Sequence, residues 1–269
     1  MVLFPNAKIN IGLNIVKKRA DGFHDIESCF YPVGWSDVLE IIPASQLSFN
    51  AQGIPIPGNS DQNLCLKAFE LIQQDYPIPN VEIELLKAVP IGAGLGGGSS
   101  DAAFTIMGLS DLFDLGLSEA QKIAYARRLG SDCAFFVKNI PTFCTGKGDV
   151  FEEIPLSLAD KWIVLVNPGI HISTAEAYAG IVAKRSEHDL RALLSLPIDQ
   201  WEGLIKNDFE EALVNKYPYI GQIKTELYQL GAHYAAMTGS GSTVYGIFEK
   251  KTEIFNYFSN CTVWQGTIK

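Results

Sequence analysis

The sequence predicts a protein of mixed α and β structure in two domains, and three observations support this. Residues 7–15 alternate between apolar and polar, which is typical of a β-strand. Residues 81–85 alternate in the same way and lead through a glycine-rich loop into a helical pattern over residues 102–109. A near-continuous apolar strand at 161–167 follows a connecting stretch, residues 154–160, and starts the second domain.

Composition limits the classes of protein that this chain can be. Its 269 residues, 47% hydrophobic and 19% charged, suffice for two modest domains or one large one. A net charge of −9 argues against nucleic acids and anionic membranes, which favour basic patches. The apolar runs are too short to span a bilayer, and the N-terminus lacks a signal-peptide pattern. The 5 cysteines form no C-x-x-C pair, so we expect reduced, buried thiols in a cytoplasmic protein.

The first long strand has a polar face that admits two interpretations. The apolar residues of 7–15 fall on one face, and Lys8, Asn10, Gly12 and Asn14 fall on the other. The polar face is either the solvated side of an outer strand or a functional surface, and the strand alone favours neither.

Local signals assign most of the remaining segments. Further strands are predicted at 28–33, 38–42 and 244–248, helices at 62–74, 199–213 and 217–230, and loops at 19–25, 52–59 and 238–243. A capping box at Ser118 opens another helix, which Gly130 closes. Asp132 follows this stop, and on local evidence it is most simply the N-cap of the apolar segment 133–137.

The loop at 92–98 carries five glycines in seven positions. Glycine is used where the backbone needs a positive φ or a close approach. Ser99 or Ser100 can cap the helix that follows. A strand, a glycine loop and a helix N-terminus in this order are typical of a phosphate site, and a purely structural loop is the lesser alternative.

Familiar phosphate-binding motifs fit this loop poorly. Its glycine spacing matches the dinucleotide fingerprint, but Asp114, at the distance of the expected acidic residue, follows a helix instead of a strand. The Walker A pattern lacks its Gly-Lys-Ser/Thr ending, and the companion motifs of protein kinases are absent.

Three segments resemble the motifs of the GHMP small-molecule kinases: residues 5–10, residues 90–103 and residues 237–242. Within that superfamily, residues 7–13, the turn at 21–24 and residues 94–103 resemble the 4-diphosphocytidyl-2-C-methyl-D-erythritol kinases most closely. The similarity runs along the whole chain. Phe23 stands where a tyrosine is common, and Cys133-Ala134 where Val-Pro is usual.

The resemblance implies an α+β fold and an enzyme, a phosphotransferase with an alcohol acceptor. Residues 1–156 would form an ATP-binding domain like domain 2 of ribosomal protein S5, residues 157–269 a ferredoxin-like domain, and the active site the cleft between them. The implied reaction is phosphorylation by ATP, with Mg²⁺, of the 2-hydroxyl of 4-diphosphocytidyl-2-C-methyl-D-erythritol, in the non-mevalonate route to isopentenyl diphosphate.

The resemblance also implies the residues of the site. Lys8 and Asp132 would be catalytic, with Asp132 as general base, which would replace both simpler interpretations given above. The ATP-binding residues would be Pro90, Gly92, Gly94, Leu95, Gly96, Gly97, Gly98, Ser99, Ser100 and Asp101, with Asn63 and Lys67 near the adenine and Ser99 or Ser100 available to Mg²⁺. The substrate-binding residues would be Asn10, Phe23, His24, Thr174, Tyr178, Gly239 and Ser240.

Several alternatives stay open. Tyr178 is chosen by spacing as the second aromatic at the cytosine and could instead be a core aromatic. The turn at 239–242 could support the phosphate loop, contact the substrate's diphosphate, or only open a strand. Rival functions are a GHMP kinase for mevalonate, homoserine or a sugar, a non-catalytic nucleotide-binding protein and, more distantly, a dinucleotide oxidoreductase. We expect a small-molecule substrate, no nucleic acid or membrane partner, and a monomer or weak homodimer.

Overall fold

The computed structural model describes residues 1–59, 62–254 and 256–269. The chain forms two compact units that are interleaved in sequence. Unit 1 comprises residues 1–7, 35–91 and 96–140, and unit 2 comprises residues 8–34, 92–95 and 141–269. A division of the sequence at 156/157 stays a prediction.

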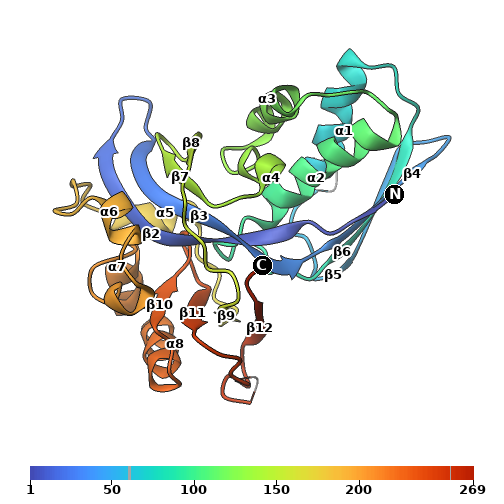
Figure 1. Ribbon diagram of the computed structural model, residues 1–269. Helices are drawn as coiled ribbons and strands as arrows, with labels where there is room; N and C mark the ends of the chain where they lie inside the picture. Colours follow the sequence, from blue (N-terminus) through green and yellow to red (C-terminus); the bar gives the residue numbers. More distant parts are fainter. Residues whose placement is uncertain (60–61, 255) are drawn as a thin grey trace. The chain divides into compact units, whose positions relative to one another are not determined.

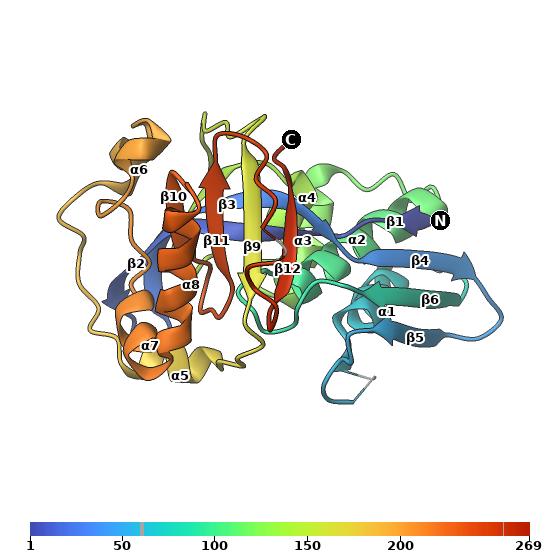
Figure 2. The ribbon, with the colours of Figure 1, turned by 90° about the horizontal axis from the view of Figure 1, so that it is seen from below.

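Unit 1 is a four-stranded sheet with helices on one face, as both ribbon views show (Figure 1, Figure 2). The strand order is β1 (Val2–Leu3), β4 (Val38–Pro43), β6 (Val81–Lys87) and β5 (Ser48–Gly53). The helices are α1 (Leu64–Asp75), α2 (Gly97–Leu112), α3 (Glu119–Leu129) and the single turn α4 (Phe135–Lys138). Helix α2 lies at the centre and packs against α1, α3, α4 and β4. β6 ends at Lys87, and the chain continues through residues 88–91 into the glycine loop at 92–98.

Unit 2 contains two four-stranded sheets. The first has the order β2 (Asn6–Lys18), β3 (His24–Ser36), β7 (Thr142–Thr145) and β8 (Val150–Glu153). The second has the order β10 (Tyr234–Met237), β11 (Val244–Phe248), β9 (Trp162–Asn167) and β12 (Thr262–Thr267), all antiparallel. Helix α8 (Pro218–Gln229) runs along β10 and β11 (Figure 2). Shorter helices complete the unit: α5 (Thr174–Ala179), α6 (Leu190–Leu194), the 3₁₀ turn Ile198–Gln200 and α7 (Glu210–Lys216).

A single apolar cluster joins these elements of unit 2. It takes Leu13 and Ile15 from β2, Val164 from β9, and Ile223 and Leu227 from α8. Leu13 and Ile15 are two residues apart on a strand, and Ile223 and Leu227 are four apart on a helix, so each pair presents one face to the same core. Burial of this face fixes the register of β2.

The predicted strands are present, and so are the helices predicted at 62–74 and 217–230, but the helix predicted at 199–213 is largely wrong. After the turn Ile198–Gln200 the chain is irregular until α7 begins at Glu210. Trp201, Ile205 and Phe209 are buried at a spacing of four, which imitates a helix face. The backbone there instead bonds β2, since Leu13 N donates to Lys206 O and Asp208 N to Leu13 O.

The polar face of β2 is buried, so the interpretation as a solvated face is wrong. Lys8, Asn10 and Asn14 are 3%, 2% and 8% exposed. Burying a charge and two amides is costly unless each is hydrogen-bonded, which makes their partners informative.

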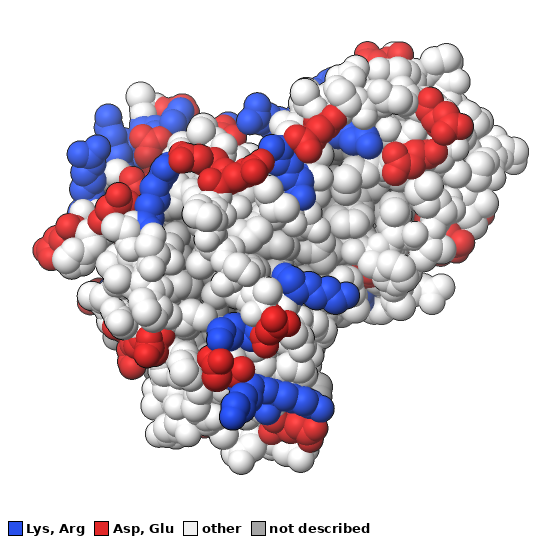
Figure 3. All heavy atoms as spheres, viewed as in Figure 1, with Lys and Arg blue, Asp and Glu red and all other residues white. Residues whose placement is uncertain are grey.

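Two surface properties bear on partners. No helix in the part of the chain that is described is long and apolar enough to cross a bilayer. On the face drawn in Figure 3, basic and acidic side chains are interspersed.

Candidate active site

A chain of hydrogen bonds runs along the polar face of β2 in unit 2. Lys8 Nζ donates to Asn10 Oδ1 at 2.6 Å, and Asn10 Nδ2 donates to Ser28 Oγ at 2.9 Å. Ser28 Oγ donates in turn to Gly12 O at 2.6 Å. The ammonium of Lys8 lies 4.4 Å from the ring centroid of Phe30. These contacts hold a buried cation in one orientation.

The turn at 238–243 packs directly against this strand. Asn10 N donates to Thr238 Oγ1 at 3.0 Å, and Tyr245 OH donates to Asn10 O at 2.9 Å. Thr238 Oγ1 also donates to Gly94 O at 3.1 Å. A Cβ at Gly94 would lie 2.0 Å from Thr238 O, so this close approach requires glycine. The turn therefore supports the part of the glycine loop that belongs to unit 2.

An aromatic cluster forms the other notable part of unit 2. The rings of His24 and Tyr178 stack with centroids 4.6 Å apart, and Tyr178 meets Phe209 edge-on at 4.9 Å. Phe23 is 55% exposed, and Lys147 Nζ lies 5.2 Å from its centroid. The structure thus brings Tyr178 together with His24 from the predicted substrate turn. The sequence selected Tyr178 by its spacing alone, and its stack on His24 is a separate, structural observation.

Other predicted substrate residues of unit 2 lie at element ends. Thr174 is the exposed first residue of α5, whose N-cap is Ser173. Gly239 is buried with a φ of 54°, and its carbonyl accepts a hydrogen bond from Asn207 Nδ2 at 2.9 Å. Ser240 is half-buried in the same turn.

The glycine loop adopts the backbone that its composition predicts. Gly92, Gly94 and Gly96 have φ values of 63°, 79° and 69°. Helix α2 begins at Gly97 with Gly96 as its N-cap and no capping side chain, so the predicted cap at Ser99 or Ser100 is wrong. Both serines lie inside the first turn, because the left-handed glycine starts the helix earlier. An N-terminus without a side-chain cap leaves backbone N–H groups to bind an anion.

A buried ion cluster in unit 1 anchors the start of α2. Lys87 Nζ contacts Asp37 Oδ2 and lies 2.9 Å from Asp101 Oδ2. Asp37 Oδ1 also accepts from Ala88 N at 2.6 Å and from Val89 N at 2.8 Å. Asp101, predicted as an ATP-loop residue, therefore contributes to this cluster.

The carboxyl of Asp101 in this cluster has a raised pKa. Burial raises the pKa of Asp101 to about 7, although Lys87 opposes the rise. Its Oδ1 is buried with no hydrogen-bond partner, whereas both oxygens of Asp37 accept donors. Burial alone would lower the pKa of Lys87, but the two carboxylates raise it above its usual value.

A cavity of about 450 Å³ in unit 1 adjoins this cluster. Asn63, Ile91, Gly98 and Asp101 are among its lining residues. Asn63 Oδ1 caps α1 by accepting from Cys65 N at 2.8 Å, which leaves its amide NH₂ group to donate. Lys67 is not among the lining residues, and its Nζ donates to Gln62 Oε1 at 2.7 Å. Of the two predicted adenine residues, the structure therefore places only Asn63 at the cavity.

Asp132 lies half-buried in the turn before α4, also in unit 1. The N-cap of α4 is Ala134, so the interpretation of Asp132 as an N-cap is wrong. Burial raises the pKa of the neighbouring Cys133 thiol to about 11, which makes it a poor nucleophile. Lys8 belongs to unit 2, so a pairing of Lys8 with Asp132 stays a prediction.

The sequence patterns did not predict Ser28, Phe30 and Tyr245 as site residues. Ser28 and Phe30 are two residues apart on one predicted strand, so their shared face was visible in the pattern, but their contact with β2 was not. None of the five cysteines takes part in a disulfide; four are buried, as expected, whereas Cys261 is only half-buried. In the residues that the structure covers, no group of three or more His, Cys, Asp or Glu side chains could hold a metal.

Comparison with known proteins identifies the family. A family model for the N-terminal domain of GHMP kinases matches residues 63–140, and one for their C-terminal domain matches residues 184–260. The 4-diphosphocytidyl-2-C-methyl-D-erythritol kinase of Cytophaga hutchinsonii is 50% identical over 257 residues, which is 95% of each chain. The kinase of the same name from Parabacteroides distasonis is 45% identical over the whole of both chains.

A solved structure gives the same answer for the fold. A crystal structure of 4-(cytidine 5'-diphospho)-2C-methyl-D-erythritol kinase matches with a TM-score of 0.84 at 27% identity, covering 99% of this chain and 98% of that one. The predicted α+β fold is thereby confirmed. The chain belongs to the GHMP kinases and, within them, to the family of the 4-diphosphocytidyl-2-C-methyl-D-erythritol kinases.

Proposed function

We propose that this kinase transfers the γ-phosphoryl group of ATP to the 2-hydroxyl of 4-diphosphocytidyl-2-C-methyl-D-erythritol, in the non-mevalonate route to isopentenyl diphosphate. The observation that carries the proposal is the buried Lys8–Asn10–Ser28 chain in the same unit as the stacked His24 and Tyr178. The names of relatives 45–50% identical over nearly the full length support the substrate.

The glycine loop and the start of α2 are proposed to hold the phosphates of ATP. Within this segment, residues 91–99 are proposed to supply backbone N–H groups at an N-terminus without a capping side chain. The residues also fit Mg²⁺: Ser100 Oγ is buried without a hydrogen-bond partner, and a metal carried by phosphates needs few protein ligands. When bound, Mg²⁺ would neutralise charge that develops on the phosphoryl oxygens.

Asp132 is proposed as the general base and Lys8 as the cation at the reacting group. The Asp132 carboxylate would accept the proton of the substrate hydroxyl, a role that typically contributes 10²–10⁴-fold in rate. The Lys8 ammonium, oriented by Asn10 and Phe30, would stabilise the negative charge of the transferring phosphoryl group.

The two bases are proposed to bind in different units. His24 and Tyr178, with Phe23 nearby in sequence, would hold the cytosine, and stacking contributes about 1–3 kcal/mol per base. The cavity at Asn63 would take the adenine, with Lys67 one helical turn further along α1. Thr174, Gly239 and Ser240 are proposed to contact the remainder of the cytidyl substrate.

The localisation, oligomeric state and partners of the enzyme are also proposals. We infer a cytoplasmic enzyme that acts as a monomer or weak homodimer and needs neither nucleic acid nor membrane. The net charge of −9 supports the absence of a polyanionic partner.

A coupled ADP-release assay tests the function. Wild-type protein should turn over the cytidyl substrate and show little activity with mevalonate, homoserine or a sugar. Asp132→Asn should lower kcat by at least about 10²-fold with ATP binding near normal, because it removes the base and keeps the shape. Asp111→Asn, at an exposed position of unit 1, is the matched control and should leave kcat unchanged.

Two results would overturn this assignment. A higher kcat/KM with mevalonate than with the cytidyl substrate would replace the proposed substrate. Near-wild-type turnover of Asp132→Asn would remove Asp132 from the mechanism.

A further inference from the structure

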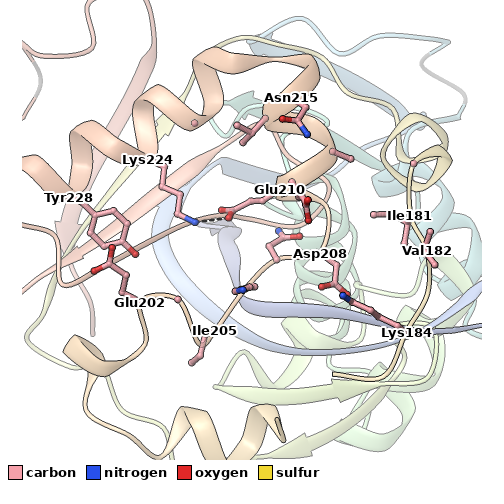
Figure 4. Close-up of a pocket in the computed structure, with 18 residues that line it drawn as sticks. Ile181, Val182, Lys184, Glu202, Ile205, Asp208, Glu210, Asn215, Lys224 and Tyr228 are labelled. Atoms are coloured by element: carbon pink, nitrogen blue, oxygen red, sulfur yellow. Dashed lines mark hydrogen bonds and ion pairs between the residues drawn. The ribbon is translucent and has the colours of Figure 1, made fainter. Parts of the chain in front are cut away.

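Four consecutive residues of unit 2, Asn207 to Glu210, contact the 237–239 turn, β2 and the ring of Tyr178. They fall in the stretch where the sequence predicts a helix and the structure has none before Glu210. Asn207, Asp208 and Glu210 also form part of the wall of a cavity of about 1030 Å³ (Figure 4). The backbone of this segment pairs with β2, through a parallel bridge between Leu13 and Asn207.

Asn207 holds the turn that carries Thr238. Its Nδ2 donates to Met237 O at 2.8 Å and to Gly239 O at 2.9 Å, so both amide hydrogens bond the two residues that flank Thr238. Its Oδ1 accepts from Phe209 N at 3.0 Å. Asn207 is 3% exposed, so water does not substitute for these bonds.

Thr238 contacts β2, the strand that carries Lys8 and Asn10. Thr238 Oγ1 accepts from Asn10 N, and Asn10 Oδ1 accepts from Lys8 Nζ. Thr238 Oγ1 also donates to Gly94 O. A displacement of this turn would therefore move the orientation of the Lys8 ammonium and the phosphate loop together.

The neighbours of Asn207 fix other parts of the same unit. Asp208 Oδ2 accepts from Ile15 N at 2.6 Å, and the ring of Phe209 packs edge-on against Tyr178. Glu210 Oε1 accepts from Met237 N, and its Oε2 pairs with Lys224 Nζ at 2.6 Å. Figure 4 shows Glu210 and Lys224 pointing toward each other across the cavity.

We infer that Asn207 is a positioning residue for phosphoryl transfer: its two amide N–H groups hold the 237–239 turn, through which Thr238 fixes Asn10 and the Lys8 ammonium. This inference rests on the proposed function, because it assumes that Lys8 acts at the reacting group. Asn207 itself contacts neither substrate nor phosphate in the mechanism proposed above.

Asn207→Asp is the sharpest test, because it keeps the shape and replaces the NH₂ group by an oxygen. An ionised carboxylate would then face two carbonyl oxygens with nothing to donate, whereas the protonated form regains one O–H donor. We expect kcat to fall about tenfold to a hundredfold, as misplacement of a reacting group does. The ratio of variant to wild-type kcat should rise as pH falls.

The cytosine end gives an internal control. The ring of Phe209 supports Tyr178, and Asn207→Asp keeps the oxygen that accepts from Phe209 N, so KM for the cytidyl substrate should change by less than about threefold. Asn215→Asp, an exposed asparagine at the same cavity (Figure 4), is the matched variant and should leave kcat and its pH profile unchanged.

A second readout does not depend on catalysis. Hydrogen exchange of backbone amides at 237–243 should accelerate about tenfold in Asn207→Asp, because the turn has lost its two donors, and stay unchanged in Asn215→Asp. If Asn207→Asp does not fold, Asn207→Ser replaces it, because serine has one O–H donor in place of the two N–H donors and effects in the same direction are expected.

The outcomes separate the two hypotheses. A folded Asn207 variant with wild-type kcat, or with unchanged exchange at 237–243, overturns the positioning role. Wild-type protein that does not phosphorylate the cytidyl substrate overturns the proposed function, whereas the exchange experiment still tests whether Asn207 holds the turn.

Discussion

Two buried lysines, one in each unit, have the same exposure and different surroundings. Lys87 and Lys8 are both 3% exposed. Lys87 bridges the carboxylates of Asp37 and Asp101 at the start of α2. The contacts that Lys8 makes within unit 2 include an amide oxygen of Asn10 and the ring of Phe30, both neutral.

The different surroundings indicate different roles for the two lysines, one in stability and the other in the proposed reaction. A buried ion cluster compensates its own charges, and removing one member leaves the others uncompensated in a medium of low dielectric constant. The Asn10 amide and the Phe30 ring orient the Lys8 ammonium, and the proposed mechanism has that ammonium act on the transferring phosphoryl group. We therefore expect Lys87 to matter mainly for stability and Lys8 mainly for turnover.

Replacing Lys87 is expected to have the largest effect. Lys87→Met should lower the free energy of unfolding by about 3–5 kcal/mol, because Asp37 and Asp101 are left as an unpaired buried pair of carboxyls. Urea unfolding measures the change. Lys161→Met, which breaks an exposed pair with Glu249, is the control and should cost no more than about 1 kcal/mol. An equal loss of unfolding free energy in Lys87→Met and Lys161→Met would show that the buried cluster contributes no more to stability than an exposed ion pair.

Replacing Lys8 should produce the opposite profile. Lys8→Met should lower kcat by about 10²–10³-fold, because a preorganised cation is lost at the transferring phosphoryl group. The loss of unfolding free energy should be smaller than in Lys87→Met. The same ADP-release assay and urea titration measure both quantities. A Lys8 variant that loses stability and keeps its turnover would reverse the assignment of the two lysines.

The smallest effect concerns the pH dependence of stability. The folded protein holds a proton on Asp101 up to a pKa of about 7, whereas an unfolded aspartate loses it near pH 4. Between these values the folded state binds the extra proton, so the free energy of unfolding should fall as pH rises from about 4 to 7 and then level off.

Asp101→Asn sharpens this point because asparagine cannot take up the proton. Urea unfolding at pH 5 and pH 8 should show the decline in the wild type, on the order of a few kcal/mol at most, and a smaller one in the variant. A variant with the full wild-type decline would show that another group carries it.

Local signals in the sequence predicted elements well where one physical cause acts alone. The capping box at Ser118 and the glycine stop at Gly130 both appear in the structure, because hydrogen bonds within a few residues decide them. The helix at 199–213 failed because Trp201, Ile205 and Phe209 repeat every four residues while the backbone between them bonds β2. A tertiary partner outweighed the periodicity.

The residues of the candidate site also differ in whether a local pattern reveals them. Lys8 and Asn10 can be found from the alternation of one strand. Ser28 bonds Asn10 directly, and Asn207 acts on it through the turn that carries Thr238. They lie 18 and 197 residues away from Asn10 in the chain, and no local pattern predicts either contact.

Several of the strands, the glycine loop with its positive φ angles and the family could be predicted from the sequence, because these depend on residues close together or on a motif of fixed order. Tertiary structure alone decided that the polar face of β2 is buried, that α2 starts at a left-handed glycine, and that His24 stacks on Tyr178. The physical reason is that burial and long-range hydrogen bonds depend on which segments meet, and no local pattern encodes that choice.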